Sequence, residues 1–395
     1  MKRATVVIGA NFGDEGKGLM TDWFCGQYAG KGPVLNVRFN GGAQAGHTVV
    51  TPDGKRHIFS HAGAGSFHPE VVTYFAPRTV LNPMLMEREA GPLGLFTSAR
   101  LVIDRECVIT TPYDMMLNQF AERHRGDGRH GSCGLGVFET VVRNRDPRFS
   151  LRVADVLAGS GNVSDLLRKI REEYMPERVR ELGIGELTEE ERGLAANEAI
   201  AERYAEELLR MCTVCGTTDT GILDKYESVV FEGAQGLLLD WDRRDYFPNI
   251  TASYTGMKNV RELLQGRKPE TTEICYVTRA YMTRHGAGRF DTECDPEQIA
   301  HGLHDPTNHT NEFQGRFRYG FLDPDGFREA VGRDLAYTDG DEMITVAVTH
   351  LDETDGKLIL PGGGKADPEA LTDGTGYRVG YLAKGPTRND VICRG

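Results

Sequence analysis

The stretch Val6–Phe24, VVIGANFGDEGKGLMTDWF, constrains the fold more than any other part of the chain. Its apolar start is typical of a buried strand, the glycines that follow predict a tight loop, and the apolar residues after them predict a helix. A strand, a glycine-rich loop and a helix N-terminus form a common cradle for phosphate, because the backbone N–H groups of the loop point at the anion. This loop also holds Asp14, Glu15 and Lys17, and two carboxylates are unexpected where only an anion binds.

The loop is not a P-loop. That motif needs a glycine, four residues, and then Gly-Lys followed by a hydroxyl residue that binds magnesium. Counting back from Gly16 and Lys17 places Asn11 at the first glycine position, and Gly18 stands where the hydroxyl is needed. A carboxylate beside Lys17 and a run of N–H groups can stay ionised, and it could then act as a general base or as a magnesium ligand.

Short β-rich runs alternate with helical stretches along the chain, which predicts a parallel, doubly wound α/β sheet. Residues 160–211 are instead rich in helix formers and charge, and they predict a helical layer with a solvated face. We therefore expect a single large α/β domain over residues 1–395, built around a mostly parallel central sheet with a helical insertion at about 160–211. The glycine-rich segment Leu360–Ala370 predicts a surface loop. The expected strands are Thr5–Ile8, Val34–Phe39, Val71–Phe75, Leu101–Ile103, Ser228–Phe231, Glu273–Tyr276 and Ile344–Thr349.

Composition and charge exclude several classes of protein. The formal net charge is -12, so a broad attraction to nucleic acid is not expected, and any phosphate should be bound locally on a small ligand. The apolar runs are strand-length and glycines break any secretory pattern near residue 13, so we expect a cytoplasmic protein without a membrane partner. Cys212 and Cys215 form the one close cysteine pair, and because no second pair completes a zinc site, we expect a structural or incidental role for them.

Further glycine-rich loops follow other predicted strands. Arg38–Val50, RFNGGAQAGHTVV, holds Gln44 and His47, and Phe231–Asp242, FEGAQGLLLDWD, holds Gln235. Several glycine loops at strand ends predict an enzyme with a nucleotide crevice at the carboxyl edge of the sheet. A dinucleotide oxidoreductase is excluded, because no G-x-G-x-x-G follows the first strand.

Together these motifs resemble those of the adenylosuccinate synthetase family, ligases that join aspartate to a purine nucleotide. The matching segments are GDEGKG, GGAQAGHT, EGAQGLLLD, TRHGAG, VTHLDETDG and GPTRND, which follow the family's order from Val6 to Asp390. The resemblance implies that GTP, or ATP, phosphorylates the purine 6-oxygen and that the aspartate amine then displaces this phosphate. It implies Mg²⁺ as cofactor, and a purine nucleoside monophosphate, L-aspartate and an NTP as the molecules bound.

The resemblance implies three catalytic residues, Asp14, His47 and Lys17. Asp14 would take the N1 proton of the 6-oxopurine, His47 would donate a hydrogen bond or proton to O6, and Lys17 would neutralise the transferring phosphoryl group. Asp14 and the Gly46 carbonyl would hold Mg²⁺. A GTP-binding regulator that has lost catalysis is the less favoured alternative, because a switch needs no base for a purine proton.

The other implied site residues bind substrates. Arg143 or Arg145 would reach across a homodimer interface to the partner's monophosphate, and Arg316 and Arg318 would bind aspartate. The residues implied for the monophosphate are Asp14, Gln44, Ser132, Cys133, Arg143, Arg145, Gln235, Thr251 and His285. Those implied for the NTP are Gly13, Glu15, Gly16, Lys17, Gly18, Gly46, His47, Thr48, His350, Asp352, Gly385 and Pro386, with Asp352 accepting both guanine donors and with the side-chain role of Glu15 left open.

The chain departs from the family pattern in a loop that bears on the substrate. Asn311–Phe321, NEFQGRFRYGF, is shorter than the family's Gly-x-Thr-Thr-Gly-Arg-x-Arg loop, which grips the aspartate carboxylates and the ribose 2′-hydroxyl. Either Arg316 and Arg318 preserve two arginines, or one is lost to Gly315. A shorter loop offers fewer groups for a 2′-hydroxyl, which favours a deoxy substrate.

Other departures from the family pattern also concern the bound ligands, and two substrates are candidates. Cys133 replaces a threonine, His285 replaces a small apolar residue near the sugar, and His350 stands where the family usually has lysine. The GPTRND ending looks more like that of the bacteriophage 2-aminoadenylosuccinate synthetases, which act on dGMP when making diaminopurine DNA, and it favours dGMP; a phage-encoded enzyme would act in the host cytoplasm. The alternative is IMP with GTP, because Asp14 and Asp352, which several phage relatives lose, are both present.

Overall fold

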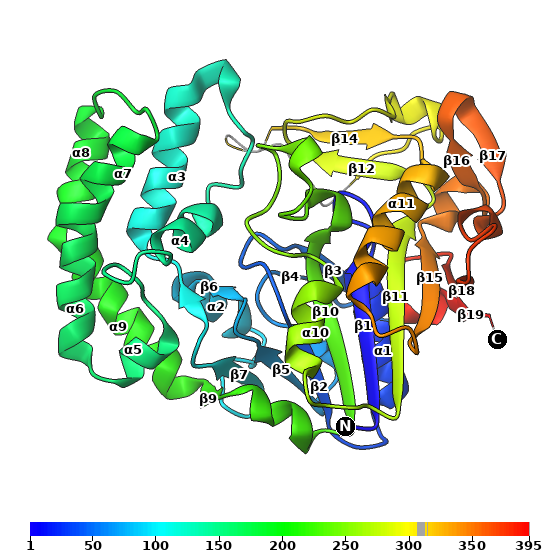
Figure 1. The fold of residues 1–395 in the computed structure, drawn as a ribbon, viewed down its shortest axis with the longest axis horizontal. Helices are drawn as coiled ribbons and strands as arrows, with labels where there is room; N and C mark the ends of the chain where they lie inside the picture. The colour runs from blue at the N-terminus through cyan, green and yellow to red at the C-terminus, as the bar shows by residue number, and fades with distance from the viewer. Residues whose placement is uncertain (306–312, 314, 395) are drawn as a thin grey trace.

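The computed structural model describes residues 1–305, 313 and 315–394, and a ten-stranded sheet runs through it (Figure 1). The strands of this sheet are β1 (Arg3–Gly9), β2 (Val34–Arg38), β5 (Val71–Phe75), β7 (Leu101–Asp104), β9 (Gly216–Thr218), β10 (Ser228–Gly236), β11 (Thr271–Arg279), β15 (Met343–Thr349), β18 (Arg378–Ala383) and β19 (Val391–Cys393). Their order is β19-β18-β15-β11-β1-β10-β2-β5-β7-β9. Each pair of neighbours is parallel except β18 and β19. The predicted α/β fold with a mostly parallel sheet is confirmed, and every predicted strand lies in this sheet.

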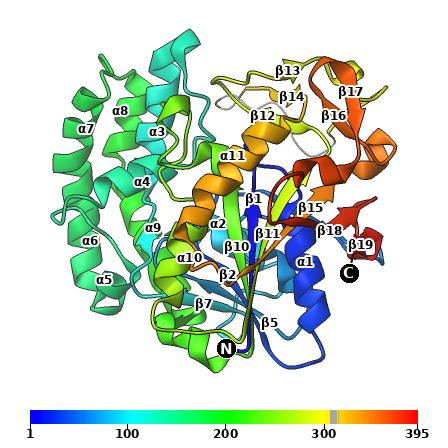
Figure 2. The ribbon, with the colours of Figure 1, turned by 45° about the vertical axis from the view of Figure 1, so that its right-hand side comes forward.

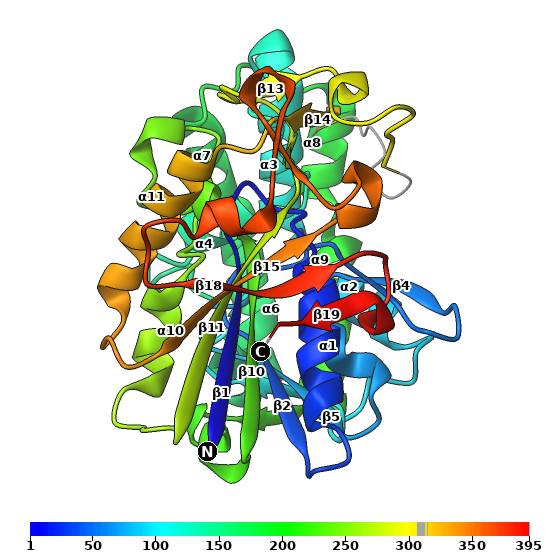
Figure 3. The same ribbon diagram turned by 90° about the vertical axis from the view of Figure 1, so that its right-hand side faces the viewer.

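Helices cover both faces of the sheet. The helix α1 (Lys17–Tyr28) lies on one face, and α10 (Met257–Leu264) and α11 (Pro324–Asp334) lie on the other (Figure 3). Alternate side chains of β1 point to opposite faces. Val7 belongs to the cluster that contains Phe24 of α1, whereas Val6 belongs to the cluster formed with α10 and α11. Burial on both faces explains why this strand is a continuous apolar run.

A helical layer stands beside the β7 and β9 edge of the sheet (Figures 1 and 2). The predicted segment 160–211 is largely helical, but the layer begins earlier than predicted, at Pro83, and a longer helix of the layer starts at Pro112. There Thr111 caps the helix and forms a capping box with Asp114, and proline occupies the first helical position. The helices are α2 (Pro83–Ala90), α3 (Pro112–Arg125), α4 (Val137–Arg143), α5 (Val153–Leu157), α6 (Ser160–Lys169), the π-helix η3 (Ile170–Tyr174), α7 (Met175–Glu181), α8 (Glu189–Ala196) and α9 (Glu198–Val214). None of the helices in the described ranges is long and apolar enough to cross a membrane.

Four small sheets complete the fold, and one of them corrects a prediction. Leu360–Ala370 was expected to be a loop, but its first part forms an antiparallel hairpin of β16 (Leu358–Leu360) and β17 (Gly364–Ala366). Gly362 and Gly363 both have φ of 77°, so these glycines make the tight turn rather than a flexible segment. The other pairs are β3 (His47–Val50) with β4 (Arg56–Phe59), β6 (Val80–Leu81) with β8 (Val108–Ile109), and β12 (Met282–His285) and β13 (Glu293–Cys294) on either side of β14 (Phe317–Gly320).

A buried carboxyl group lies where α11 ends against α10 and the sheet. Asp334 accepts hydrogen bonds of 2.8 Å from the backbone N–H of Met257 and of 2.8 Å from the Tyr276 hydroxyl. Burial raises the pKa of Asp334 to about 7, although both hydrogen bonds oppose that shift. The folded protein therefore holds a proton on Asp334 at pH values at which an unfolded carboxyl would be ionised.

We expect Asp334 to make the protein less stable as the pH rises. Its folded pKa of about 7 lies above the ordinary value of 3.8, so its contribution is fully present below about pH 4 and is lost as the pH approaches 7. Over this window the free energy of unfolding of the wild type should fall relative to Asp334→Asn, by up to roughly 4 kcal/mol at about 1.4 kcal/mol per pKa unit. Chemical denaturation of both proteins across this range measures the difference, and parallel pH curves would contradict the assignment.

Candidate active site

A cavity of about 1000 Å³ opens at the carboxyl edge of the central sheet. Its lining comes from segments that follow β1, β2, β10, β11 and β15, together with part of the helical layer. Parallel strands end at the same edge of a sheet, so loops that are far apart in the sequence meet there. The volume suits a nucleotide-sized ligand.

Most of the predicted site residues lie in this one cavity. In the described ranges, Glu15, Arg143, Arg145, Arg316 and Arg318 are the predicted site residues absent from its lining. The predicted residues that do line it are Gly13, Asp14, Gly16, Lys17, Gly18, Gln44, Gly46, His47, Thr48, Ser132, Cys133, Gln235, Thr251, His285, His350, Asp352, Gly385 and Pro386.

The two carboxylates of the first loop point in different directions. Glu15 is buried, and its Oε1 accepts hydrogen bonds from the backbone N–H groups of Asn11, at 3.0 Å, and Gly13, at 2.8 Å. Its Oε2 lies 2.6 Å from Nζ of Lys17. Glu15 therefore holds the loop from inside, while the neighbouring Asp14, with a φ of 59°, presents its carboxylate to the cavity.

The carboxylate of Asp14 is held ionised by positive charge. Its Oδ2 lies 3.1 Å from Nε2 of His285, and its backbone carbonyl accepts a 2.6 Å hydrogen bond from Nε of Arg279. Burial by itself would raise the pKa of Asp14, but the hydrogen bond and charge of His285, with the charges of Arg279 and Lys17, lower it to about 2. An ionised carboxylate on a cavity wall is the form that a base or a metal ligand requires.

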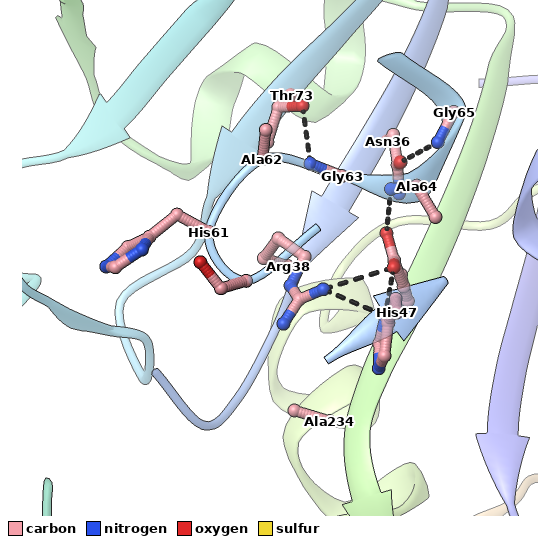
Figure 4. A network of polar contacts seen from close by, with 12 residues as sticks. Asn36, Arg38, His47, His61, Ala62, Gly63, Ala64, Gly65, Thr73 and Ala234 are labelled. Carbon is pink, nitrogen blue, oxygen red and sulfur yellow. Dashed lines mark hydrogen bonds and ion pairs between the residues drawn. The ribbon is translucent and has the colours of Figure 1, made fainter. Parts of the chain in front are cut away.

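His47 is part of a buried polar network (Figure 4). Its Nδ1 makes a short contact with Oε1 of Glu232 and lies 3.0 Å from Nη1 of Arg38. The same Glu232 oxygen accepts a 3.1 Å hydrogen bond from Arg38. Burial and the Arg38 charge lower the pKa of His47, and Glu232 opposes them, so the imidazole is neutral at neutral pH in the free protein.

Arg143, one of the two arginines predicted to reach a partner's monophosphate, has its side chain in the protein interior. The side chain is fully buried, and its Nε and Nη2 each donate a 2.9 Å hydrogen bond to Asp114, while Nη2 also donates to the carbonyl of Ile109. Arg145, two residues later, is exposed, and its guanidinium lies 5.3 Å from the centre of the Trp241 ring. Of the two arginines, only Arg145 has a side chain that can reach a neighbouring molecule.

Arg316 and Arg318 lie outside the cavity and share one carboxylate. Arg318 pairs with Glu293 and donates from Nη1 to the carbonyls of Gly286, at 3.1 Å, and Gly288, at 2.9 Å. The exposed Arg316 also pairs with Glu293, at 3.3 Å. Part of the short loop to which they belong, residues 311, 312 and 314, lies outside the described residues.

The far wall of the cavity carries His350 and Asp352, after β15. Burial and the charge of Arg279 hold the pKa of His350 well below its usual value, so it presents a neutral ring where the family has a lysine. His350 Nδ1 lies 2.7 Å from Oγ1 of Thr349, and its ring packs edge-on against Tyr281. Asp352 is exposed, so its carboxylate can accept hydrogen bonds from a ligand.

The oxygen atoms that line the cavity fit a magnesium ion that is bound mainly by water and substrate phosphates and by few protein groups. The described part of the chain holds no cluster of three or more His, Cys, Asp or Glu side chains suited to a metal. Mg²⁺ commonly keeps several waters and binds through one or two carboxylates together with substrate phosphates. Asp14 and the exposed Gly46, which both line the cavity, could supply protein oxygens of this kind.

Three residues that sequence reasoning assigned no role are prominent here. Arg279, the last residue of β11, contacts Asp14 and donates from Nη1 to the Tyr281 hydroxyl at 2.9 Å. Arg284 lines the cavity over the ring of Phe12. Glu232 lies in the EGAQG motif, one residue before its first glycine, and faces His47. The available signals were a charged residue directly after the predicted strand Ser228–Phe231, for Glu232, and a charged residue at the carboxyl end of β11, for Arg279.

Comparison with known proteins identifies relatives that cover most of the chain. A family model described as adenylosuccinate synthetase matches residues 6–356. The adenylosuccinate synthetase of Polynucleobacter asymbioticus is 32% identical over 295 residues, which cover 74% of this chain and 63% of that relative, less than two thirds of its length. The adenylosuccinate synthetase of Neisseria meningitidis serogroup C is 29% identical over 388 residues, which cover 93% of this chain and 83% of that relative.

Two solved structures share the fold. Fully ligated adenylosuccinate synthetase from Plasmodium falciparum matches with a TM-score of 0.71 and 18% identity, covering 99% of both chains. The succinoaminodeoxyadenylate synthetase of cyanophage S-2L, solved with dGMP and with dATP as an energy donor, matches with a TM-score of 0.64 and 17% identity. That match covers 100% of this chain and 95% of the cyanophage chain.

Replacing Arg143 with leucine should destabilise the protein by about 3–5 kcal/mol, because it leaves the buried Asp114 carboxylate without its charge partner. Arg145→Leu, two residues away, is the matched control, and losing its contact with Trp241 should cost less than about 1 kcal/mol. Urea denaturation gives the free energy of unfolding of both variants. Equal, small losses would show that the buried pair contributes no more than a surface arginine.

Proposed function

Because the chain belongs to the adenylosuccinate synthetase family, we propose that it is an NTP-dependent ligase that joins the amino group of L-aspartate to C6 of a 6-oxopurine nucleoside monophosphate, with dGMP favoured. Enzymes of this family form a C–N bond at the expense of an NTP. The observation that carries the proposal is that Asp14, Lys17 and His47, from two separate loops, line one cavity of nucleotide size.

The reaction proceeds in two steps. Asp14 takes the proton from N1 of the purine, the electron pair moves to O6, and O6 attacks the γ-phosphorus of the NTP while the bond to the β-phosphate oxygen breaks. The aspartate amine then attacks C6, the C6–O bond breaks, and inorganic phosphate leaves as the amine loses a proton. Asp14 suits the first step because it is ionised and faces the cavity.

His47 and Lys17 stabilise the charge that moves in these steps. His47, when protonated, donates to O6 as this oxygen becomes part of the leaving group, and Lys17 neutralises the phosphoryl group in transfer. In the free protein Lys17 is paired with Glu15, which fixes its ammonium group at the base of the loop. Mg²⁺, when bound through Asp14 and the Gly46 carbonyl, supplies further positive charge to the phosphates.

GTP is the proposed phosphoryl donor. Asp352 is exposed on the cavity wall, and a single carboxylate can accept hydrogen bonds from both N1–H and N2–H₂ of guanine. Gly385 and Pro386 line the cavity with Asp352 and would close over the same base. ATP is the alternative donor, and its adenine edge offers that carboxylate no matching pair of donors.

The choice of dGMP rests on the sugar. Arg316 and Arg318, which would replace the family's loop arginines, both pair with Glu293 and lie away from the cavity lining. Neither of these two arginines lines the cavity in which a 2′-hydroxyl would lie, and this favours a deoxyribose as the sugar. Glu293 pairs with both arginines through its carboxylate, as a carboxylate of the substrate would. Aspartate would therefore bind to the arginines by displacing the Glu293 carboxylate.

IMP is the second candidate, and a different observation favours it. The relatives that match this chain at 29–32% identity are named adenylosuccinate synthetases. IMP has the same 6-oxo edge as dGMP and lacks the 2-amino group. The two candidates therefore share the chemistry at Asp14 and His47 and differ only in the contacts to the 2-position and the sugar.

A homodimer is the proposed assembly. Arg145 is exposed and stacks over Trp241, so its guanidinium is held at the surface. Unlike Arg143, it does not direct its N–H groups to a buried carboxylate of the described residues. We assign it the contact with the monophosphate bound by a second copy of the chain. Arg143, which the sequence left as an alternative, serves instead to neutralise Asp114.

Asp14→Ala should abolish turnover while leaving nucleotide binding intact. Loss of a general base typically lowers kcat by about 10²–10⁴-fold. Asp53→Ala removes an exposed loop carboxylate outside the cavity and should leave kcat unchanged. Coupled measurement of phosphate release gives kcat, and calorimetry gives the affinity for the monophosphate; a kcat near that of the wild type would overturn the role of Asp14.

The identity of the monophosphate is tested by assaying dGMP, GMP and IMP side by side with aspartate and GTP. If no protein group pairs with the 2′-hydroxyl, dGMP should be used at least as well as GMP. A buried donor left unpaired would instead lower kcat/KM for dGMP by about tenfold to a hundredfold. Turnover of IMP with dGMP inert would replace the dGMP assignment with the second candidate, and no turnover with any of them would refute the ligase itself.

A further inference from the structure

A carboxylate that the proposed mechanism does not use lies directly behind His47. Glu232, in the middle of β10, is completely buried. One of its oxygens contacts Nδ1 of His47 and Nη1 of Arg38, and the other accepts a 3.0 Å hydrogen bond from the backbone N–H of Ala64 (Figure 4). Both carboxylate oxygens are therefore occupied, and all three partners are donors if Nδ1 carries a proton.

The contacts define where the proton of His47 sits. Glu232 is ionised, because Arg38 and His47 lower its pKa to about 2 although burial alone would raise it, so it can only accept hydrogen bonds. An unprotonated Nδ1 would place two acceptors against each other at this short contact. Arg38 can only donate, and it is satisfied by the same carboxylate oxygen. The proton on Nδ1 therefore points at Glu232 whether the imidazole is neutral or charged.

This arrangement leaves Nε2 as the nitrogen that meets the substrate. His47 lines the cavity, and its Nδ1 points away from the cavity into the network. Figure 4 shows the second ring nitrogen of His47 on the side opposite the dashed contacts. A carboxylate that fixes one imidazole nitrogen determines the tautomer and the orientation of the other.

The surroundings of Glu232 are fixed tightly enough to serve this purpose. The turn that supplies the Ala64 N–H, at the start of η1 (Ala64–Phe67), is anchored on both sides. The Gly63 N–H donates to the Thr73 hydroxyl at 3.0 Å, and the Gly65 N–H donates to Oδ1 of Asn36 at 3.1 Å. A Cβ on Gly63 would lie 2.1 Å from the same Asn36 oxygen, so only glycine allows the backbone this close to β2.

We propose that Glu232 is a positioning residue for His47, whose Nδ1 proton it holds so that Nε2 faces O6 of the bound monophosphate. The proposal rests on the proposed function, since it assigns the catalytic contact to His47. The competing role is purely structural, in which Glu232 only balances the buried charge of Arg38. The two roles differ in what happens at the His47 ring when Glu232 changes.

The first test observes the ring in the wild-type protein without any substrate. In protein labelled with ¹⁵N-histidine, the signals absent from His47→Asn belong to His47. We expect the neutral ring to carry its proton on Nδ1, with Nε2 unprotonated. A ring protonated on Nε2, with Nδ1 bare, would overturn the proposal. This result does not depend on turnover, so it stands apart from the fate of the proposed function.

The second test removes the charge of Glu232 while keeping its shape. Glu232→Gln has one acceptor oxygen in place of two, so it cannot satisfy the Ala64 N–H and the His47 Nδ1–H with the same geometry. We expect kcat to fall by about a hundredfold or more, with KM for the monophosphate and GTP changed by less than about threefold. Asp334→Asn is the matched control, another buried carboxylate converted to an amide, and it should keep kcat within about twofold.

A double-mutant cycle separates positioning from structure. If Glu232 acts through His47, the kcat of Glu232→Gln combined with His47→Asn should equal that of His47→Asn alone within about threefold. Losses that multiply would show that Glu232 acts independently of His47 and would overturn the proposal. If Glu232→Gln fails to fold, the ¹⁵N measurement on the wild type still decides the matter. If the wild type turns over none of the monophosphates, the proposed function fails, and the ring measurement alone tests the contact.

Discussion

The inward carboxylate of Glu15 is the contact on which the first loop depends. It accepts hydrogen bonds from two backbone N–H groups and pairs with the Lys17 ammonium, between the end of β1 and the start of α1. Because a buried carboxylate must accept hydrogen bonds from nearby donors, these contacts restrict the conformations that the loop can adopt. Asp14, beside it, is left in a left-handed conformation with its carboxylate toward the cavity. The two carboxylates of this loop therefore differ in direction: Glu15 holds the loop from inside, and Asp14 faces the cavity.

The cavity pairs carboxylates with imidazoles in two opposite arrangements. At Asp14 the carboxylate faces the cavity and His285 supports it from the side. At His47 the imidazole faces the cavity and Glu232 supports it from behind. Each supporting group favours one charge or proton position on its partner, because electrostatic effects are strong where water is excluded. An ionised carboxylate and a neutral imidazole are in this way presented to the same cavity.

Burial separates residues that look alike in the sequence. Arg143 and Arg145 lie two positions apart, near the C-terminal end of α4, yet one neutralises Asp114 in the interior and the other stacks on Trp241 at the surface. Arg143 is the last residue of α4, whereas Arg145 lies in the turn beyond the helix, so the two side chains leave the backbone in different surroundings. Arg316, directly before β14, and Arg318, within it, instead share one partner, Glu293.

The amino-acid sequence alone determined the class of fold and seven of the ten strands of the central sheet, but not β9, β18 and β19. These follow from local patterns: apolar runs such as Val6–Ile8 and the glycines after them constrain only their own segment. It also determined that Asp14, Lys17 and His47 belong together, through the order of the motifs. It did not reveal the early start of the helical layer or the hairpin at Leu358–Ala366, where capping and turn chemistry outweighed composition.

Only the tertiary structure decided the direction of each charged side chain. Asp14 beside His285, Arg143 beside Asp114, and Glu232 between His47 and the backbone of Ala64 are distinguished by partners that lie far away in the sequence. A carboxylate or guanidinium is buried only where its charge is matched, and that match depends on strands and loops meeting from distant parts of the chain. Local sequence patterns do not predict these contacts, because the strand ends come to one edge only when the parallel sheet has formed.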